Sequence, residues 1–118
     1  MPTADLQELA RKYFAAYVTK ERGVVHGLLS DDFTFTSPYD DRIGRAAYFE
    51  KCWPNSAKIR TIAVEKLCGQ GAEIFVRYRL ELFGGAAFRN TELLRFDGDR
   101  IVDIEVYFGR TIKDGPRQ

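Results

Sequence analysis

Apolar residues in the first part of the chain recur every three or four positions, which is the spacing of amphipathic helices. The first predicted helix starts from Thr3, a suitable N-cap, and its apolar face comprises Leu6, Leu9, Ala10, Tyr13 and Tyr17. After a break at residues 20–23, a second helix is predicted with an apolar side made of Val24, Val25, Leu28 and Leu29. A third helix is predicted over residues 44–53, and Pro54 ends it.

Later in the chain the spacing changes to two, which is typical of β-strands with two different faces. The segment 73–83 places one set on the first face: Ile74, Val76, Tyr78, Leu80 and Leu82. The second face carries Phe75, Arg77, Arg79, Glu81 and Phe83. Strands are also predicted over residues 59–67, 88–96 and 101–108, with a hairpin turn at Asp97-Gly98-Asp99.

Helices followed by antiparallel strands predict an α+β fold in a single domain spanning residues 1–118, with the helices covering one face of a curved sheet. The uncovered face mixes the charged residues of segment 73–83 and Glu105 with aromatic residues such as Phe75 and Tyr107. Because these aromatic side chains would otherwise contact water, we expect a homodimer through this outer sheet face.

The charge and the cysteine spacing exclude several classes of partner. With 18 Lys and Arg against 17 Asp and Glu, and no block of like charge, we expect no nucleic acid. The N-terminal segment contains Asp5 and Glu8 and does not resemble a signal peptide, and no long apolar run is present, so we expect a cytoplasmic protein without membrane contact. Cys52, Cys68 and the single histidine lack metal-binding or redox spacing, and no phosphate-binding or dinucleotide motif occurs, so no metal and no cofactor are expected.

Glu92 is the most informative candidate for chemistry. Strict alternation puts it on the same face as Leu94 and Phe96, and a carboxyl group in an apolar interior keeps its proton and can serve as a general acid or hydrogen-bond donor. The alternative is a carboxylate at the strand mouth that pairs with an arginine. Tyr13 and Tyr17 lie four residues apart on the first helix, where tyrosines are usually core residues; beside Glu92, the Tyr13 hydroxyl could help to hold a carbonyl oxygen.

The segment SDDFTFTSPYDD contains a short predicted strand with acidic residues at both ends. Phe33, Phe35 and Ser37 share one face, so inward phenylalanines turn Ser37 inward as well. Asp31 and Asp32 are predicted to precede the strand, in solvent.

His26 invites a catalytic triad with Ser37 and an acid. No Gly-x-Ser-x-Gly turn surrounds Ser37, however, and a structural or surface histidine is the favoured interpretation.

Segments along nearly the whole chain resemble one superfamily. RKYFAAY is similar to its first helix, LLSDDFTFTSP to its first strand, IGRAAYFE to its third helix and LLRFDGDRIVDIEVYFG to its closing hairpin. In order and spacing they resemble the nuclear transport factor 2-like superfamily, in particular its ketosteroid isomerase and SnoaL-like branch. The resemblance implies a cystatin-like α+β fold, in which a curved antiparallel sheet wraps around the N-terminal helices as a cone-shaped barrel.

The resemblance also implies catalytic roles. Tyr13 matches the oxyanion-hole tyrosine of the isomerases, and Glu92 matches the protonated aspartic acid beside it, a carboxylic acid kept neutral by an apolar site. The general-base aspartate, which is followed by proline, is replaced by Ser37-Pro38. A serine hydroxyl without an adjacent base cannot abstract a carbon-bound proton at neutral pH, so Asp40 is the candidate to replace it, with a solvated loop position as its alternative.

The resemblance places a further set of side chains around the cone and its opening: Tyr17, Phe33, Phe35, Ser37, Trp53, Tyr78, Leu80, Leu94, Phe96, Ile104, Val106 and Phe108. Such a wall favours a small hydrophobic ligand, flat or aliphatic.

Three functional hypotheses follow. In the first, the domain binds an apolar, carbonyl-bearing molecule and isomerises, cyclises or hydrates it by acid catalysis from Tyr13 and Glu92. In the second, it is a non-catalytic ligand-binding or dimerisation module, which the missing base favours. The third is hydrolysis through His26 and Ser37, which requires the two side chains to lie within hydrogen-bonding reach.

Overall fold

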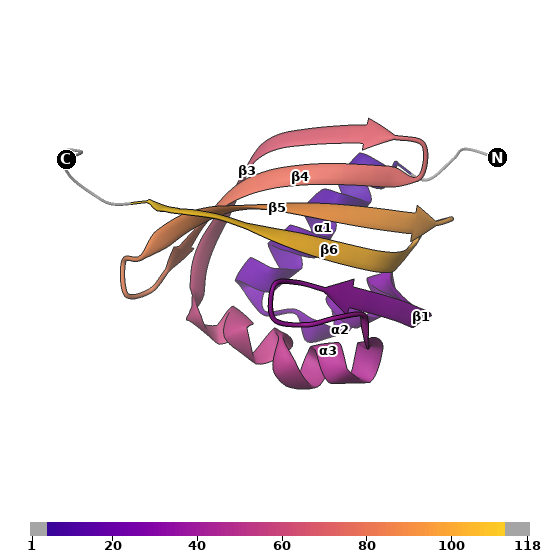
Figure 1. The fold of residues 1–118 in the computed structure, drawn as a ribbon, viewed down its shortest axis with the longest axis horizontal. Helices are drawn as coiled ribbons and strands as arrows, with labels where there is room; N and C mark the ends of the chain where they lie inside the picture. Colours follow the sequence, from indigo (N-terminus) through magenta and orange to yellow (C-terminus); the bar gives the residue numbers. More distant parts are fainter. Residues whose placement is uncertain (1–4, 113–118) are drawn as a thin grey trace.

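Helices dominate the first half of the chain and strands the second (Figure 1). The computed structural model describes residues 5–112. The helices are α1 (Leu6–Thr19), α2 (Arg22–Leu28), α3 (Arg45–Lys51) and the 3-10 helix η1 (Trp53–Lys58). The strands are β1 (Leu29–Thr36), β2 (Ile43–Gly44), β3 (Ile59–Gln70), β4 (Glu73–Leu82), β5 (Ala87–Asp97) and β6 (Arg100–Ile112).

The strands form one curved sheet in the order β2-β1-β6-β5-β4-β3. All neighbours pair antiparallel except β1 and β6, which are parallel. The sheet curves around α1 and stays open, since β2 and β3 form its two edges (Figure 1). The predicted α+β cone fold is therefore confirmed.

Helix α1 begins at a side-chain cap. The Asp5 carboxylate accepts hydrogen bonds from the backbone N–H groups of Gln7 and Glu8, at 3.0 and 3.3 Å. These bonds satisfy two of the donors that a helix leaves free at its start, and the negative charge suits that end of the helix dipole. Thr3, the predicted cap, lies outside the described residues.

The boundary between the second helix and the first strand differs from the prediction. Leu29 begins β1 and pairs with Ile101 of β6, so it is buried as a strand residue rather than as part of the helix. Asp31 and Asp32 consequently lie within β1, exposed, and do not precede it. The backbone pairing decides the boundary here, because the leucine is apolar enough to suit either element.

The third helical segment also differs from its prediction. Helix α3 ends at Lys51, and Pro54 stands in the first turn of η1 instead of ending the helical run. Proline is compatible with this position because the first turn of a helix does not use the backbone N–H groups that proline lacks.

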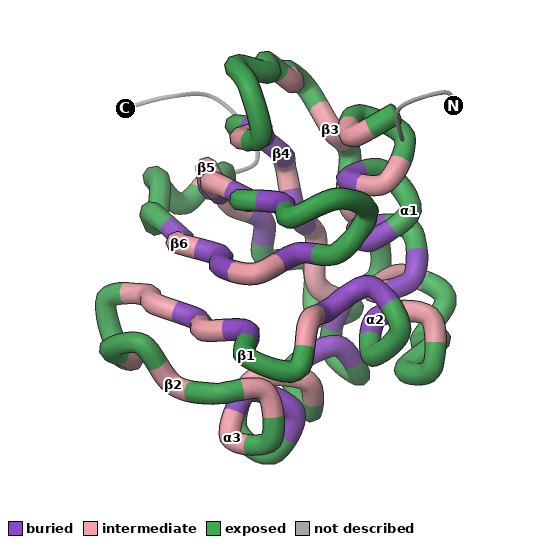
Figure 2. Tube along the Cα trace, turned by 90° about the vertical axis from the view of Figure 1, so that its right-hand side faces the viewer, coloured by how far each residue is buried: buried purple, intermediate pink, exposed green. Residues whose placement is uncertain are grey.

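The alternation predicted for β4 is confirmed. Ile74, Val76, Tyr78 and Leu80 are buried, whereas Phe75 is 46% exposed. Figure 2 shows the same alternation of buried and less buried positions along the strands of the sheet. Strands β3 and β6 extend past their predicted ends, to Gln70 and Ile112.

The inner face of the sheet and the helices enclose the core. Helix α1 packs on β3 and β4, and α3 packs on β1. The largest fully buried side chains are Tyr48, Phe33, Leu29, Leu94, Ile101, Ile104, Val25 and Val76. No helix in the described part of the chain has both the length and the apolar character needed to cross a membrane.

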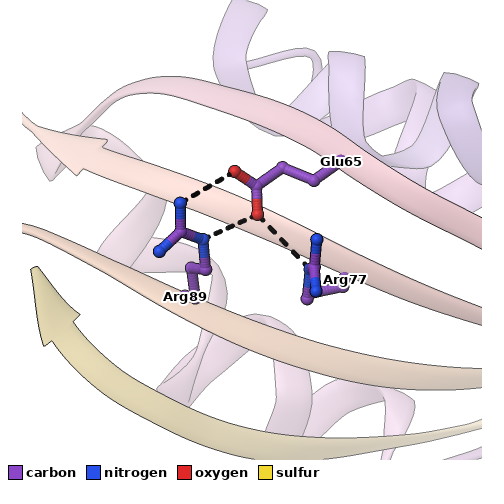
Figure 3. A network of polar contacts seen from close by, with 3 residues as sticks. All are labelled: Glu65, Arg77 and Arg89. Carbon is purple, nitrogen blue, oxygen red and sulfur yellow. Dashed lines mark hydrogen bonds and ion pairs between the residues drawn. The ribbon is translucent and has the colours of Figure 1, made fainter.

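The outer face of the sheet carries an ion-pair network across three strands (Figure 3). Glu65 of β3 accepts two hydrogen bonds from Arg89 of β5, at 2.7 and 3.2 Å, and lies 3.4 Å from the Arg77 guanidinium of β4. The hydrogen bond from Arg89, together with the charges of both arginines, lowers the pKa of the Glu65 carboxyl. Charges on this face are thus partly neutralised within the chain.

Candidate functional site

A cavity of about 180 Å³ lies between the inner face of the sheet and the helices. Its lining comes from both layers and from the segment between β1 and β2: Tyr13, Phe14, Tyr17, Phe35, Ser37, Tyr39, Asp40, Tyr48, Cys52, Asn55, Ile59, Ile62, Tyr78, Leu80, Asn90, Glu92, Val106 and Phe108. Most of these side chains are aromatic or aliphatic. Most of the polar groups among them form three clusters.

The first cluster centres on Glu92, which is only 7% exposed. The Tyr78 hydroxyl donates a hydrogen bond of 2.5 Å to Glu92 Oε2 and accepts one of 3.3 Å from the Asn90 amide. The other carboxyl oxygen, Oε1, is buried without a hydrogen-bond partner among the described residues. A buried polar atom of this kind needs a partner, and here a bound molecule can supply one.

The pKa of Glu92 is raised from 4.5 to about 7. Burial is the main cause, because an apolar environment disfavours the charged carboxylate, and the hydrogen bond from Tyr78 acts in the opposite direction. Near neutral pH the side chain therefore exists both as a carboxylic acid, which donates a hydrogen bond, and as a carboxylate, which only accepts.

The second cluster consists of three tyrosine hydroxyls from the helical layer. The Tyr48 hydroxyl of α3 is hydrogen-bonded to that of Tyr13 at 2.6 Å and also to that of Tyr17, both on α1. Burial raises the pKa of Tyr13 and Tyr48 well above 10, so these phenols stay neutral. The hydroxyls of Tyr13 and Tyr48 are buried polar groups satisfied by each other, and they also line the cavity.

The third cluster lies where the chain leaves β1. Asp40 Oδ2 accepts a hydrogen bond from the Ser37 hydroxyl at 3.2 Å and a longer one from the Cys52 thiol at 3.9 Å. Two backbone hydrogen bonds between Ser37 and Asp40, of 2.8 and 3.2 Å, fix the turn. Burial and the nearby Asp40 raise the pKa of the Cys52 thiol to about 11, so it remains a protonated donor.

The structure brings ten of the predicted site residues to the cavity: Tyr13, Tyr17, Phe35, Ser37, Asp40, Tyr78, Leu80, Glu92, Val106 and Phe108. The other five do not line it: Phe33, Trp53, Leu94, Phe96 and Ile104. Four of these five are core residues, and Trp53 packs its ring on Tyr17, with centroids 4.8 Å apart. Alternation assigns a residue to the inner face but does not tell how far along the strand the cavity extends.

Tyr48 and Asn90 are the functional candidates that sequence reasoning missed. Asn90 lies two residues before Glu92 on β5, so strict alternation puts both side chains on the same face, and Asn90 could have been predicted to point inward. Tyr48 lies four residues before Cys52, so both fall on one side of the predicted third helix. This spacing alone does not indicate that the side faces a cavity, so it is a weaker signal.

A close approach of two strands helps to place Asn90. Its side-chain oxygen accepts a hydrogen bond of 3.2 Å from the backbone N–H of Gly109 on β6. The pairing register shifts between Phe88 and Asn90, and a Cβ atom at Gly109 would come within 1.9 Å of the Arg89 carbonyl oxygen. Only glycine allows this contact, which therefore supports the Asn90–Tyr78–Glu92 cluster from the neighbouring strand.

His26 does not join Ser37. It is an exposed residue of α2, it stacks on Phe49 with ring centroids 5.5 Å apart, and it lines a separate hollow between α2 and α3. Ser37 donates its hydroxyl hydrogen bond to Asp40 instead. The triad hypothesis therefore has no support from the arrangement of these side chains. The described residues contain no group of three or more His, Cys, Asp or Glu side chains that could hold a metal ion.

The open, curved sheet wrapped around α1 has the nuclear transport factor 2-like fold. The SnoaL-like domain profile matches residues 10–104, and the chain belongs to this family. A comparison with curated protein sequences finds no significant match.

Solved structures share the fold at low sequence identity. A nuclear transport factor 2-like protein of unknown function from Cytophaga hutchinsonii is 22% identical with a TM-score of 0.74, over 92% of this chain and 94% of that one. A hypothetical protein from Catenulispora acidiphila with a ketosteroid isomerase-like fold, in complex with trimethylamine, is 18% identical with a TM-score of 0.70, over 86% and 85%. A de novo designed protein with a curved β-sheet is 13% identical with a TM-score of 0.78, over 92% and 88%. Because a designed sequence shares the fold, function has to be argued from the cavity.

Proposed function

We propose that this domain binds a small, largely apolar molecule bearing a carbonyl group, and that the protonated Glu92 side chain donates a hydrogen bond to the carbonyl oxygen. The observation that supports this proposal most directly is that Glu92 Oε1 is buried beside the cavity and has no hydrogen-bond partner within residues 5–112. In its acid form this group is a donor placed in an apolar space, where a hydrogen bond to a carbonyl is stronger than in water.

The volume of the cavity limits the size of the ligand. A cavity of about 180 Å³ is close to the roughly 150 Å³ that holds one benzene molecule and lies below the roughly 300–1,000 Å³ typical of drug-sized ligands. We therefore favour a single-ring or short aliphatic carbonyl compound over a four-ring steroid. Trimethylamine, which accompanies the related Catenulispora structure, is a molecule of similarly small size.

The catalytic form of this proposal needs a base, and Asp40 is the best placed group. It lines the cavity, and it accepts a hydrogen bond from the hydroxyl of Ser37, the residue that the family resemblance matches to the isomerase base. Asp40 would take a proton from the carbon next to the carbonyl, the electron pair would form an enolate, and the Glu92 acid would stabilise the enolate oxygen. Return of the proton to another carbon completes an isomerisation.

Binding and catalysis can be tested separately. Binding of acetophenone is measured near pH 6, where the Glu92 acid predominates, in the wild type and in Glu92→Gln. Glu105→Gln is the matched control, because it makes the same change on the outer face of the neighbouring strand. We expect Glu92→Gln to weaken the binding of acetophenone, and of a phenolate that is ionised at this pH, such as pentafluorophenolate, even more. Unchanged affinities would show that Glu92 does not donate a hydrogen bond to the ligand.

The alternative is a ligand-binding domain without catalysis. Exchange of the acetophenone methyl protons in D₂O, followed by NMR, distinguishes the two forms of the proposal. Catalysed exchange that disappears in Asp40→Asn supports the enolate mechanism, whereas exchange no faster than in buffer, together with intact binding, supports the non-catalytic form.

We also propose that the outer sheet face forms a homodimer. Phe75 is 46% and Tyr107 is 52% exposed on neighbouring regions of this face, beside charges that are paired within the chain. Aromatic residues with partly neutralised arginines are typical of the centre of a protein interface. Sedimentation velocity gives the oligomeric state directly, and a monomer at all concentrations would contradict the proposal.

A further inference from the structure

The ionisable groups that line the cavity can become negatively charged but not positively charged. Among the described residues that line it there is no lysine, arginine or histidine, and the only carboxyl groups are those of Glu92 and Asp40. Lys20 lies outside the lining and donates its ammonium hydrogens to the carbonyl oxygens of Tyr17 and Ile59, at 3.2 and 2.6 Å. A carboxylate formed in the cavity therefore has no cationic side chain beside it among the described residues that line the cavity.

The two carboxyl groups differ in how well they are satisfied. Asp40 accepts from the Ser37 hydroxyl and the Cys52 thiol. Glu92 accepts only from Tyr78, at Oε2, and its buried Oε1 has no partner among the described residues. If Glu92 ionises, its charge is the one left uncompensated, and a buried charge of this kind is costly without a counter-ion.

The walls of the cavity are suited to a cation. Six of its aromatic rings belong to Tyr13, Tyr17, Phe35, Tyr48, Tyr78 and Phe108. The faces of aromatic rings carry partial negative charge and attract substituted ammonium ions, which combine a positive charge with an apolar surface. Ring faces and a carboxylate together are the two features by which proteins hold such ions.

We propose that the cavity also binds a small substituted ammonium ion, with the Glu92 carboxylate as its counter-ion and the surrounding aromatic rings as its cage. A tertiary ammonium such as trimethylammonium would donate its N–H to Glu92 Oε1 and place its methyl groups on the rings. The cavity volume of about 180 Å³ admits an ion of this size. The inference uses the same cavity as the proposed function but does not rest on the binding of a carbonyl compound.

The two ligand classes require opposite states of Glu92, so their affinities should depend on pH in opposite directions. The titratable groups that line the cavity around Glu92 are Tyr13 and Tyr17 on α1, Tyr48 on α3, Cys52 after it, Tyr78 on β4, and Tyr39 and Asp40 between β1 and β2. Burial raises the pKa of the four buried tyrosines on α1, α3 and β4 and of the Cys52 thiol, so these groups stay neutral near pH 7. Glu92 is then the group whose charge changes near neutrality.

Tetramethylammonium is the sharpest probe, because its own charge does not change with pH. Its affinity is measured by isothermal titration calorimetry between about pH 6 and pH 8. With a Glu92 pKa of about 7, the carboxylate fraction rises from roughly one tenth to nine tenths, so we expect binding to tighten about ninefold. The neutral molecule tert-butanol, of similar size, should bind weakly and without this pH dependence.

Two outcomes would overturn the inference. One is tetramethylammonium binding no tighter than tert-butanol at pH 8, and the other is an affinity that stays constant with pH in the wild type. In Glu92→Gln the pH dependence should disappear and binding at pH 8 should be weaker than in the wild type, while Glu105→Gln should behave as the wild type. Since the pH series on the wild type needs no variant, the test holds even if Glu92→Gln does not fold. Acetophenone titrated in parallel shows whether the carbonyl proposal fails independently.

Discussion

Replacing Glu92 with glutamine should remove a pH-dependent loss of stability. In the unfolded chain Glu92 has an ordinary pKa of 4.5, and in the folded protein burial raises it to about 7. Between these values the folded state binds more protons than the unfolded state, so folding is favoured at low pH and weakened as pH rises. The stabilising effect of the proton is fully present below pH 4.5 and is lost once the pH has passed about 7.

The size of the effect follows from the two pKa values. A difference of one pH unit corresponds to about 1.4 kcal/mol, so the full change from 4.5 to about 7 amounts to about 3.5 kcal/mol in the free energy of unfolding, of which about 3 kcal/mol is lost above pH 4.5. Glutamine has nearly the same shape as the protonated acid but cannot ionise. Relative to the wild type, Glu92→Gln should therefore gain about 3 kcal/mol of stability between pH 4.5 and pH 8.

Urea denaturation of both proteins across this pH range measures the effect, and the difference between the two curves cancels the contributions of all other titrating groups. Glu105→Gln controls for the loss of a surface carboxylate. A stability difference between Glu92→Gln and the wild type that stays constant with pH would refute the reasoning, because it would mean that Glu92 has the same pKa in both states.

Three further predictions concern the surroundings of the site. Gly109→Ala should destabilise the protein by at least about 2 kcal/mol in urea denaturation, since its Cβ would lie 1.9 Å from the Arg89 carbonyl oxygen, whereas Gly84→Ala, with nothing within 4 Å, should have little effect. Equal effects of the two changes would contradict the close approach. Tyr48→Phe should cost about 1–3 kcal/mol, because it removes the shared partner of two neighbouring hydroxyls, and a neutral result would contradict that role. Phe75→Lys should shift the sedimentation coefficient toward that of a monomer if the outer face forms a dimer, and an unchanged coefficient would exclude this residue from the interface.

The periodicity of the sequence was sufficient to predict the three helical segments, the longer strands in their order along the chain, and the inward face of β4, but not the short strand β2 or the 3-10 helix η1, and it left the facing of β3 open. Glu92 is the clearest case: alternation alone turned it inward, and the structure shows a buried carboxyl. Boundaries were harder to predict, because Leu29 is equally suited to a helix and to a strand, and only its pairing with Ile101 decides. Pro54 likewise suited both the end of one helix and the start of the next.

The composition of the cavity was only partly predictable. Alternation identified inward residues such as Leu94 and Ile104, but it does not tell how deep each residue lies within the cone. Both belong to the core, because that depth depends on how the helices and the sheet pack together. The contact of Ser37 with Asp40 depends on a turn whose geometry the residue types alone do not determine. Tyr48 was missed because it faces the cavity only through the placement of α3 against β1.

The most direct test of the central claim is an NMR titration of the Glu92 side-chain carboxyl carbon, assigned with the help of Glu92→Gln, in the free protein and with acetophenone. We predict a pKa of about 7 in the free protein, because the carboxyl is buried, and a higher pKa with acetophenone, because the carbonyl oxygen accepts a hydrogen bond only from the acid form. A free pKa near 4.5 would contradict the claim that burial keeps Glu92 protonated, and a pKa that acetophenone leaves unchanged would contradict its role as the donor to the ligand.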